Sequence, residues 1–242
     1  MVTPAIDRGT RHPVTRSAAP HPTAPNATAA AVLRALRNRG DRRLAAYLAV
    51  DGDPDDALTG RPRQGGLIVV GAHLPPGADG GADHETCPVL VYGPGRPDGP
   101  GTGPVLLALD DDANAAALTW YASAEAARRG SVLRVVHVWA ETGSPQGRRL
   151  GRHDRISDAD RLLAGVLHES GRPAGPPPER QIVHDRLPAH ALDELSRTAA
   201  LLVVGARSRS ADRHGDLGET AGALLGRTRC PLAILPARDD PG

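Results

Sequence analysis

The sequence predicts an α/β protein: a doubly wound, parallel five-stranded sheet over residues 104–237, preceded by a partial repeat of the same unit. Two observations lead to this prediction. Short aliphatic runs alternate with helical segments, which is typical of parallel strands joined by crossover helices. A pair of motifs also occurs twice, as "LIVVGA" with "CPVLVY" and as "LLVVGA" with "CPLAIL".

The composition supports a folded core and excludes several functions. A chain of 242 residues with 40% hydrophobic content can bury a core, which must be mostly aliphatic because the chain has no Phe. All 29 basic residues are arginine, so lysine Schiff-base and P-loop lysine chemistry are excluded. A net charge of +1 and arginine pairs without interleaved aromatic residues predict no nucleic-acid partner. No apolar stretch reaches the ~18 residues of a membrane span, and two cysteines without an export signal indicate a cytoplasmic protein.

The N-terminal part is expected to contain a tail and an incomplete unit. Residues 1–28 lack any apolar period and are predicted to be a disordered tail. Residues 29–92 follow as helix "AAAVLRALRNRG", strand "RLAAYLAV", helix "DPDDAL", strand "GGLIVVGA" and strand "CPVLVY". Glycine and proline then dominate residues 93–103, which read as a linker.

The region 104–237 alternates strand and helix throughout. Its predicted strands are "VLLALD", "SVLRVVHVW", "QIVHD", "LLVVGA" and "CPLAILP". Between them lie a helix ended by Gly130, a helix opening at Ser157, a helix with Pro188 in its first turn, and a helix from about Glu219 to Arg227.

The two copies of the repeated pair differ in the length of the link between their strands. Gly71 and Cys87 are sixteen residues apart, whereas Gly205 and Cys230 are twenty-five apart, so the first copy is nine residues shorter. The first copy also lacks everything upstream of its third helix. We therefore expect it to depend on the second copy for burial.

The segments "VLLALDDD", "VVHVW" and "VVGARS…GET…CPLAIL" resemble the universal stress protein family. The resemblance covers residues 104–237 fully and residues 29–92 as a truncated copy, which implies a tandem protein with the fold shared by the adenine nucleotide alpha hydrolases. It implies a regulatory role in the stress response, with ATP or another adenine nucleotide bound in the 104–237 domain.

Nucleotide-binding members of this family carry a loop G-x-x-G-x9-G followed by Ser or Thr, and the same frame here is Gly205, Ser208, Gly218 and Glu219. Glycines in such a loop allow positive φ and close approach to phosphate. Ser208 would be strained at this position if the loop needs positive φ there. The carboxylate of Glu219, in the first turn of the helix, would itself occupy the positive helix end that a phosphate should use, an interaction of about 0.3–1 kcal/mol. Thr220 lies one residue beyond the family's hydroxyl position. Arg207, Arg209 and Arg213 favour the opposite outcome, because guanidinium groups beside the loop can bind phosphate oxygens.

The resemblance also assigns residues at the strand ends. Asp110 matches the aspartate that holds the ribose or adenine, and Ala108, Val138 and Val204 match positions of the nucleotide site. Asp110 has a second interpretation, because any aspartate of "DDD" could cap the following helix and Asp112 stands where the N-cap is expected.

Other candidates have simpler structural explanations. His84 and Cys87 could share a metal ion, but the Cys-Pro pair opens the final strand in both copies, so no metal is predicted. His137 and His184 lie in predicted strands and are expected to be core or edge residues. No nucleophile, base and acid set is present, so an enzyme is not predicted, and slow ATP hydrolysis is a third hypothesis.

The sequence allows an alternative function and two alternative modes of assembly. Ser208 and Glu219 support an alternative function, a nucleotide-free interaction or dimerisation module with a degenerate phosphate loop. In this family the final strand often pairs across a dimer. "CPVLVY" and "CPLAIL" are therefore expected either to pair within one chain as a pseudo-dimer or to form a homodimer through the last strand.

Overall fold

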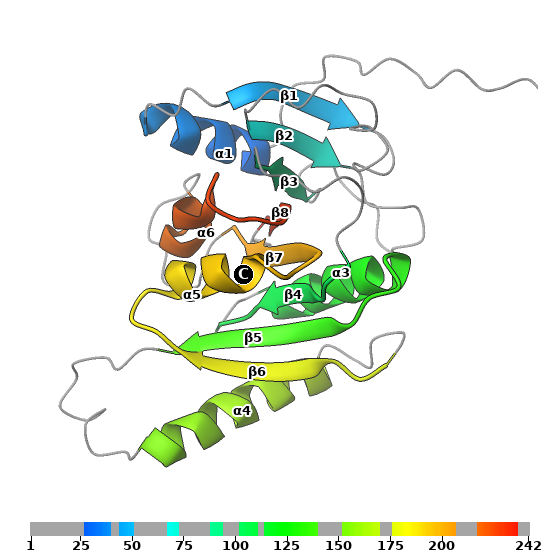
Figure 1. The fold of residues 1–242 in the computed structure, drawn as a ribbon, viewed down its shortest axis with the longest axis vertical. Helices are drawn as coiled ribbons and strands as arrows, with labels where there is room; N and C mark the ends of the chain where they lie inside the picture. The colour runs from blue at the N-terminus through cyan, green and yellow to red at the C-terminus, as the bar shows by residue number, and fades with distance from the viewer. Residues whose placement is uncertain are drawn as a thin grey trace, which may run out of the picture.

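The computed structural model describes residues 27–39, 44–50, 67–72, 88–93, 102–110, 114–139, 152–169, 176–206 and 217–236. These residues form one eight-stranded sheet in the order β1-β2-β3-β8-β7-β4-β5-β6 (Figure 1). The strands are β1 (Leu44–Val50), β2 (Leu67–Ala72), β3 (Val89–Tyr92), β4 (Val105–Ala108), β5 (Leu133–Trp139), β6 (Glu179–His184), β7 (Leu201–Gly205) and β8 (Leu232–Leu235). None of the helices in the described ranges has the length and apolar character needed to cross a membrane.

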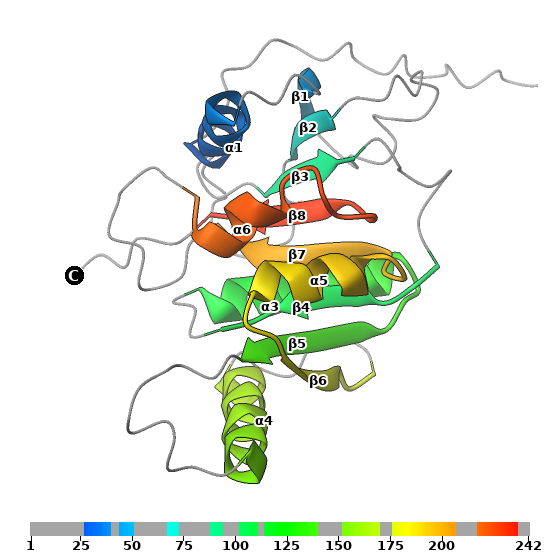
Figure 2. The same ribbon diagram turned by 60° about the vertical axis from the view of Figure 1, so that its left-hand side comes forward.

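The five strands from β4 to β8 confirm the predicted fold class. All pairings among these five strands are parallel, and helices cover both faces of the sheet (Figure 2). Helices α3 (Ala115–Arg128) and α4 (Arg152–Glu169) pack on one face. Helices α1 (Ala27–Asn38), α5 (Pro188–Ser196) and α6 (Glu219–Leu224) pack on the other. Two apolar cores result, one on each side of the sheet.

The position of a strand in the sheet explains its sequence. Strands β7 and β8 lie between covered faces, and their aliphatic runs LLVV and LAIL are buried at every position. Strand β6 lies at the sheet edge, where none of its six residues is fully buried. Its exposed end carries Glu179 and Arg180, and such charged residues protect an edge strand against pairing with another chain.

Strand β3 runs opposite to the other seven strands. It pairs antiparallel with β8, with Leu90 opposite Ala233, so the two "CP" strands do meet within one chain. It also pairs antiparallel with β2, whereas the matching strands β7 and β8 are parallel. The repeated sequences therefore do not have the same strand directions. A parallel neighbour requires a crossover, and the shorter link before β3 favours the antiparallel arrangement.

Two predicted helix signals are confirmed. Helix α3 ends at Arg128 and is terminated by Gly130, whose φ is +59°, with hydrogen bonds from Ser131 N to Ala126 O (2.8 Å) and from Gly130 N to Ala127 O (3.1 Å). These two bonds form a Schellman motif, in which glycine tolerates the left-handed conformation. Pro188 lies in the first turn of α5, where a missing N–H costs nothing.

Three boundaries predicted from the sequence are wrong. Helix α4 begins at Arg152, so Ser157 lies inside the helix, where its side chain is exposed and does not cap the helix start. The N-cap of α3 is Asn114 rather than Asp112. Helix α1 begins at Ala27, so the last two residues of the predicted tail are helical. The "DPDDAL" helix and residues 94–101 of the linker lie outside the described residues.

Candidate functional site

The order of the described strands places a topological switch point at the carboxyl edge of the sheet, between β4 and β7. Strand β4 pairs with β5 on one side and with β7 on the other, so the chain leaves β4 and β7 in opposite directions around the sheet. Doubly wound folds bind ligands at this switch point. Asp110 follows β4 and Gly205 ends β7, which brings these two predicted site residues to the same edge.

Asp110 is exposed and follows a residue that is held tightly. Leu109 is buried, its N–H donates to Val136 O (2.9 Å), and its carbonyl accepts from His137 Nδ1 (3.0 Å). The N-cap position of α3, which the sequence assigned to an aspartate, is occupied by Asn114, and the Asn114 side chain makes no capping hydrogen bond. The Asn114 amide donates to Pro236 O (2.8 Å), and this bond ties the start of α3 to the end of β8.

Three aliphatic side chains lie on one face of the sheet beside this switch point. Val204 is buried in the core under α1, α5 and α6, and Ala108 and Val138 pack against the same core while keeping partial exposure. They come from the neighbouring strands β7, β4 and β5. We call these three residues the apolar wall; Ala108 and Val138 are its partly exposed members.

Backbone hydrogen bonds of Ala206 and Gly218 close the base of the predicted phosphate loop. Ala206 N donates to Leu235 O (2.7 Å), and Gly218 N donates to Ala206 O (2.7 Å). Gly218 has a φ of −57°, and among the described residues only Gly130 and Gly226 have positive φ. Neither Gly205 nor Gly218 therefore uses the positive φ that glycine allows. The glycine N–H at position 218 is already bonded, and Ser208 lies outside the described residues with the three neighbouring arginines.

Helix α6 provides little attraction for an anion. It has six residues, so few peptide dipoles are aligned in it. Glu219 is its first residue and is exposed, as the sequence indicated, and its carboxylate supplies a negative charge at this end. Thr220 follows and is half-buried.

The two strand histidines have structural partners. His137 is 8% exposed and bonds the Leu109 carbonyl. The ring of His184 lies 4.4 Å from the ring of Trp139, at an interplanar angle of 57°. Both are core or edge residues, as the sequence predicted.

An acid and base pair between β6 and α5 was missed from the sequence. Asp185 Oδ2 lies 2.8 Å from His190 Nδ1, and Asp185 Oδ1 accepts the Leu187 N–H at 2.9 Å. The hydrogen bond with Asp185 raises the pKa of His190, and the same bond, with that from Leu187, lowers the pKa of Asp185. The only available signal was the aspartate three residues before the start of a helix, where its side chain can bond the N–H two residues further on.

The second cysteine is chemically quiet. Burial raises the pKa of the Cys230 thiol to about 12, so the reactive thiolate form is scarce. Cys230 packs in the core under α1, α5 and α6. His84 and Cys87 lie outside the described residues.

Comparisons with known proteins agree with this architecture. The family model described as Universal stress protein family matches residues 102–236. "Universal stress protein MT2052" of Mycobacterium tuberculosis (strain CDC 1551 / Oshkosh) is 29% identical over 203 residues, which are 76% of this chain and 63% of that protein. The chain spans between about half and two thirds of the length of the curated relatives it matches.

Among solved structures, the universal stress protein from Archaeoglobus fulgidus in complex with dAMP is 19% identical, with a TM-score of 0.39, over 55% of this chain and 97% of that one. A universal stress protein in complex with cAMP is 21% identical, with a TM-score of 0.42, over 57% of this chain and 99% of that one. Because the family match spans more than half of its 242 residues, the chain belongs to the universal stress protein family.

Proposed function

We propose that this chain is a regulatory protein of the stress response whose 104–237 domain binds ATP or another adenine nucleotide. One observation carries the proposal: Asp110 and Gly205 end neighbouring strands at the switch point, beside the apolar wall of Ala108, Val138 and Val204. Relatives solved with dAMP and cAMP make adenine nucleotides the first ligands to test.

Each side of this switch point suits one part of a nucleotide. A carboxylate such as that of Asp110 accepts hydrogen bonds from ribose hydroxyls. The apolar wall would contact the face of the adenine ring. The phosphate side is weaker, because the Gly218 N–H is already bonded and Glu219 is negative. We therefore expect affinity to fall as phosphates are added, from AMP to ATP.

The first test is a calorimetric titration of the purified protein with AMP, ADP and ATP, together with analysis of any nucleotide released on heating. Asp110→Ala should weaken AMP binding about tenfold or more, as expected when a charge-assisted hydrogen bond is lost. Glu194→Ser is the matched control, since Glu194 is an exposed acid in the last turn of α5. No released nucleotide and flat titrations with all three ligands would contradict the proposal.

A nucleotide-free interaction module is the second candidate, and the closed Gly218 N–H together with Glu219 favours it. Glu219→Ser separates the two. If the chain binds nucleotide, this variant should bind ATP about fivefold more tightly, because roughly 1 kcal/mol of competition for the helix end is removed. If the parent binds none and the variant gains micromolar affinity, the module interpretation is correct.

We propose binding rather than catalysis at this site. Phosphate release from ATP should stay at the uncatalysed rate, and the measurement is a phosphate assay on the parent and on Asp110→Ala. Release by the parent that disappears in the variant would make the protein a slow ATPase.

We also propose that residues 29–92 are a truncated copy of the family unit that now covers β8. The repeated motifs and the β3–β8 pairing support this origin, while the antiparallel pairing of β2 with β3 differs from the parallel pairing of β7 with β8. With β3 on that edge, we expect a monomer. Light scattering that finds a dimer would instead favour pairing between chains.

A further inference from the structure

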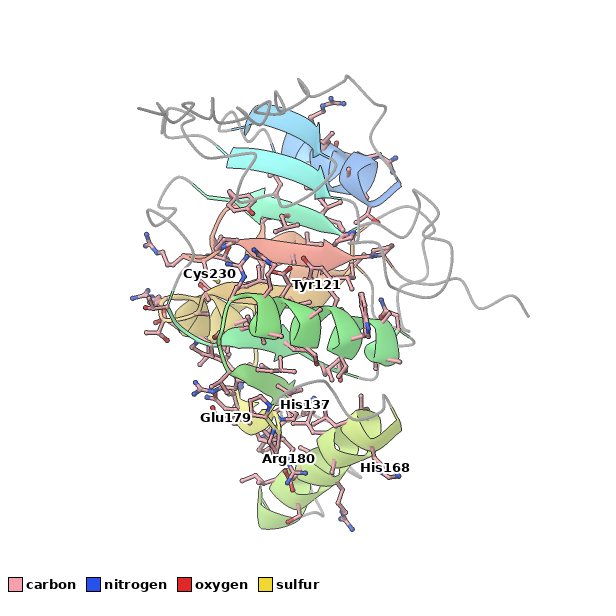
Figure 3. All side chains as sticks on the ribbon, turned by 90° about the vertical axis from the view of Figure 1, so that its right-hand side faces the viewer. Tyr121, His137, His168, Glu179, Arg180 and Cys230 are labelled. Carbon is pink, nitrogen blue, oxygen red and sulfur yellow. The ribbon has the colours of Figure 1, made fainter. Side chains whose placement is uncertain are left out.

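We infer that His137 is a positioning residue for Asp110, and that Asn114 assists it from the other end of the β4–α3 connection. This inference rests on the proposed function, because it gives a task to two buried polar side chains that the nucleotide itself would not touch. Figure 3 labels His137 on β5, on the side of the sheet that carries α3 and α4.

The bond made by His137 lies where the β4 ladder stops. The last registered pair between β4 and β5 is Ala108 with Val136. Beyond it, Leu109 N still donates to Val136 O (2.9 Å), and the His137 side chain donates to the Leu109 carbonyl (3.0 Å). Both polar backbone groups of Leu109 are thus held by β5, and Asp110 is the next residue.

The chemistry of the contact fixes the form of the imidazole. A carbonyl oxygen only accepts, so Nδ1 must carry the proton. Leu109 is 3% exposed and His137 is 8% exposed, so water has little access to replace this bond. An apolar side chain at 137 would leave the Leu109 carbonyl without its donor, and the peptide that carries Asp110 would shift to find another.

Asn114 holds the other end of the same connection. It is 5% exposed, and its amide donates to Pro236 O (2.8 Å) at the end of β8. Neither bond supports a regular helix or strand, since one lies past the end of β4 and the other lies before the start of α3. Each bond joins the chain beside Asp110 to a different strand of the sheet.

The experiment compares His137→Leu with His137→Asn, because the asparagine amide can place a donor near the position of Nδ1. His137→Leu should weaken AMP binding about tenfold and shift the backbone NMR signals of Asp110, and His137→Asn should restore both. Ser196→Ala is the matched control, since Ser196 is 1% exposed and its hydroxyl bonds Asp193 O and Arg229 N at the opposite edge of the sheet. It should lower the melting temperature without changing affinity or the Asp110 signals.

A second measurement needs no variant. The ¹⁵N chemical shifts of His137 in the parent protein should report a proton on Nδ1. A proton on Nε2 alone would overturn the inference, as would Asp110 signals that are the same in His137→Leu and in the parent. If the parent binds no nucleotide, the proposed function fails, and the NMR measurements still decide whether His137 holds Asp110.

Discussion

The two regions that share a motif pair differ in how their strands are joined. In residues 102–236, β7 and β8 are parallel, and α6 lies between them in the chain. In the first region, β2 and β3 belong to the same pair of motifs, with LIVVGA in place of LLVVGA and CPVLVY in place of CPLAIL, and they are antiparallel. The residues of a strand determine whether it is buried, and the length of the connection determines its direction.

A second difference concerns dependence on the other region. Strands β4 to β8 have helices on both faces, whereas β3 lies between β2 and β8 and completes its burial against both cores. Leu90 packs in the core under α3 and α4, and Val91 packs in the core under α1, α5 and α6. The joint between the two regions, where β3 pairs with β8, is therefore part of the core. Substitutions in β3 can test this conclusion.

The largest effect is expected at this joint. Val91→Asp places a carboxylate where the side chain is 2% exposed, and it should lower the free energy of unfolding by about 4 kcal/mol, because the charge must be buried or β3 must leave β8. Urea unfolding measures the loss. Once β8 is uncovered, light scattering should also detect association through its edge.

Val132→Asp is the control for that variant, since Val132 is 41% exposed. It should change the free energy of unfolding by no more than about 0.5 kcal/mol. An equal loss in both variants would show that β3 does not share the core of the second region.

A smaller loss is expected where the second region begins. A Cβ at Gly103 would lie 1.8 Å from Thr198 O. The other atoms nearest to it also belong to the backbone of residues 198 and 199, so no flexible side chain can move aside to make room. Gly103→Ala should therefore cost about 2 kcal/mol, the typical size of overpacking. Gly165→Ala in α4 is the matched control, because a Cβ there meets nothing within 4 Å, and alanine should stabilise the helix by about 0.5–1 kcal/mol. Thermal unfolding of both variants should give shifts of opposite sign.

The smallest effect concerns pH and the Asp185–His190 pair. Since the pKa of His190 is raised, its contribution is complete below its unfolded value of about 6.5 and is lost as the pH rises through the folded value. Since the pKa of Asp185 is lowered, its contribution is present above about 3.9 and is lost as the pH falls through the folded value. The pair is therefore strongest between about pH 4 and 6.5.

Asp185→Asn isolates the charge, because its amide oxygen can still accept the Leu187 N–H. An NMR titration should give His190 a lower pKa in this variant than in the parent. Asp193→Asn should lower it less, since Asp193 acts on His190 only through a weaker Coulombic attraction. Equal pKa values in parent and Asp185→Asn would show that the 2.8 Å contact does not persist in solution.

Much of the fold could be predicted from local signals. Gly130 and Pro188 mark a helix end and a helix start because their backbone preferences act within a single turn. Ser157 and Asp112 misled the prediction because serine and aspartate are good N-caps wherever they stand, and only packing selects which candidate is used. The site was harder to predict, since the hydrogen bonds of His137 and Asn114 span 28 and 122 residues of sequence.

The sequence by itself determined the family, the run of buried strands and the frame of Gly205, Gly218 and Asp110, because these depend on residue type and spacing along the chain. The tertiary structure alone decided the direction of β3, the closure of the loop base by the Gly218 N–H, and the clamp of His137 on Leu109. Each of these depends on which distant backbone group lies within about 3 Å of a donor, and that proximity exists only after the sheet has assembled.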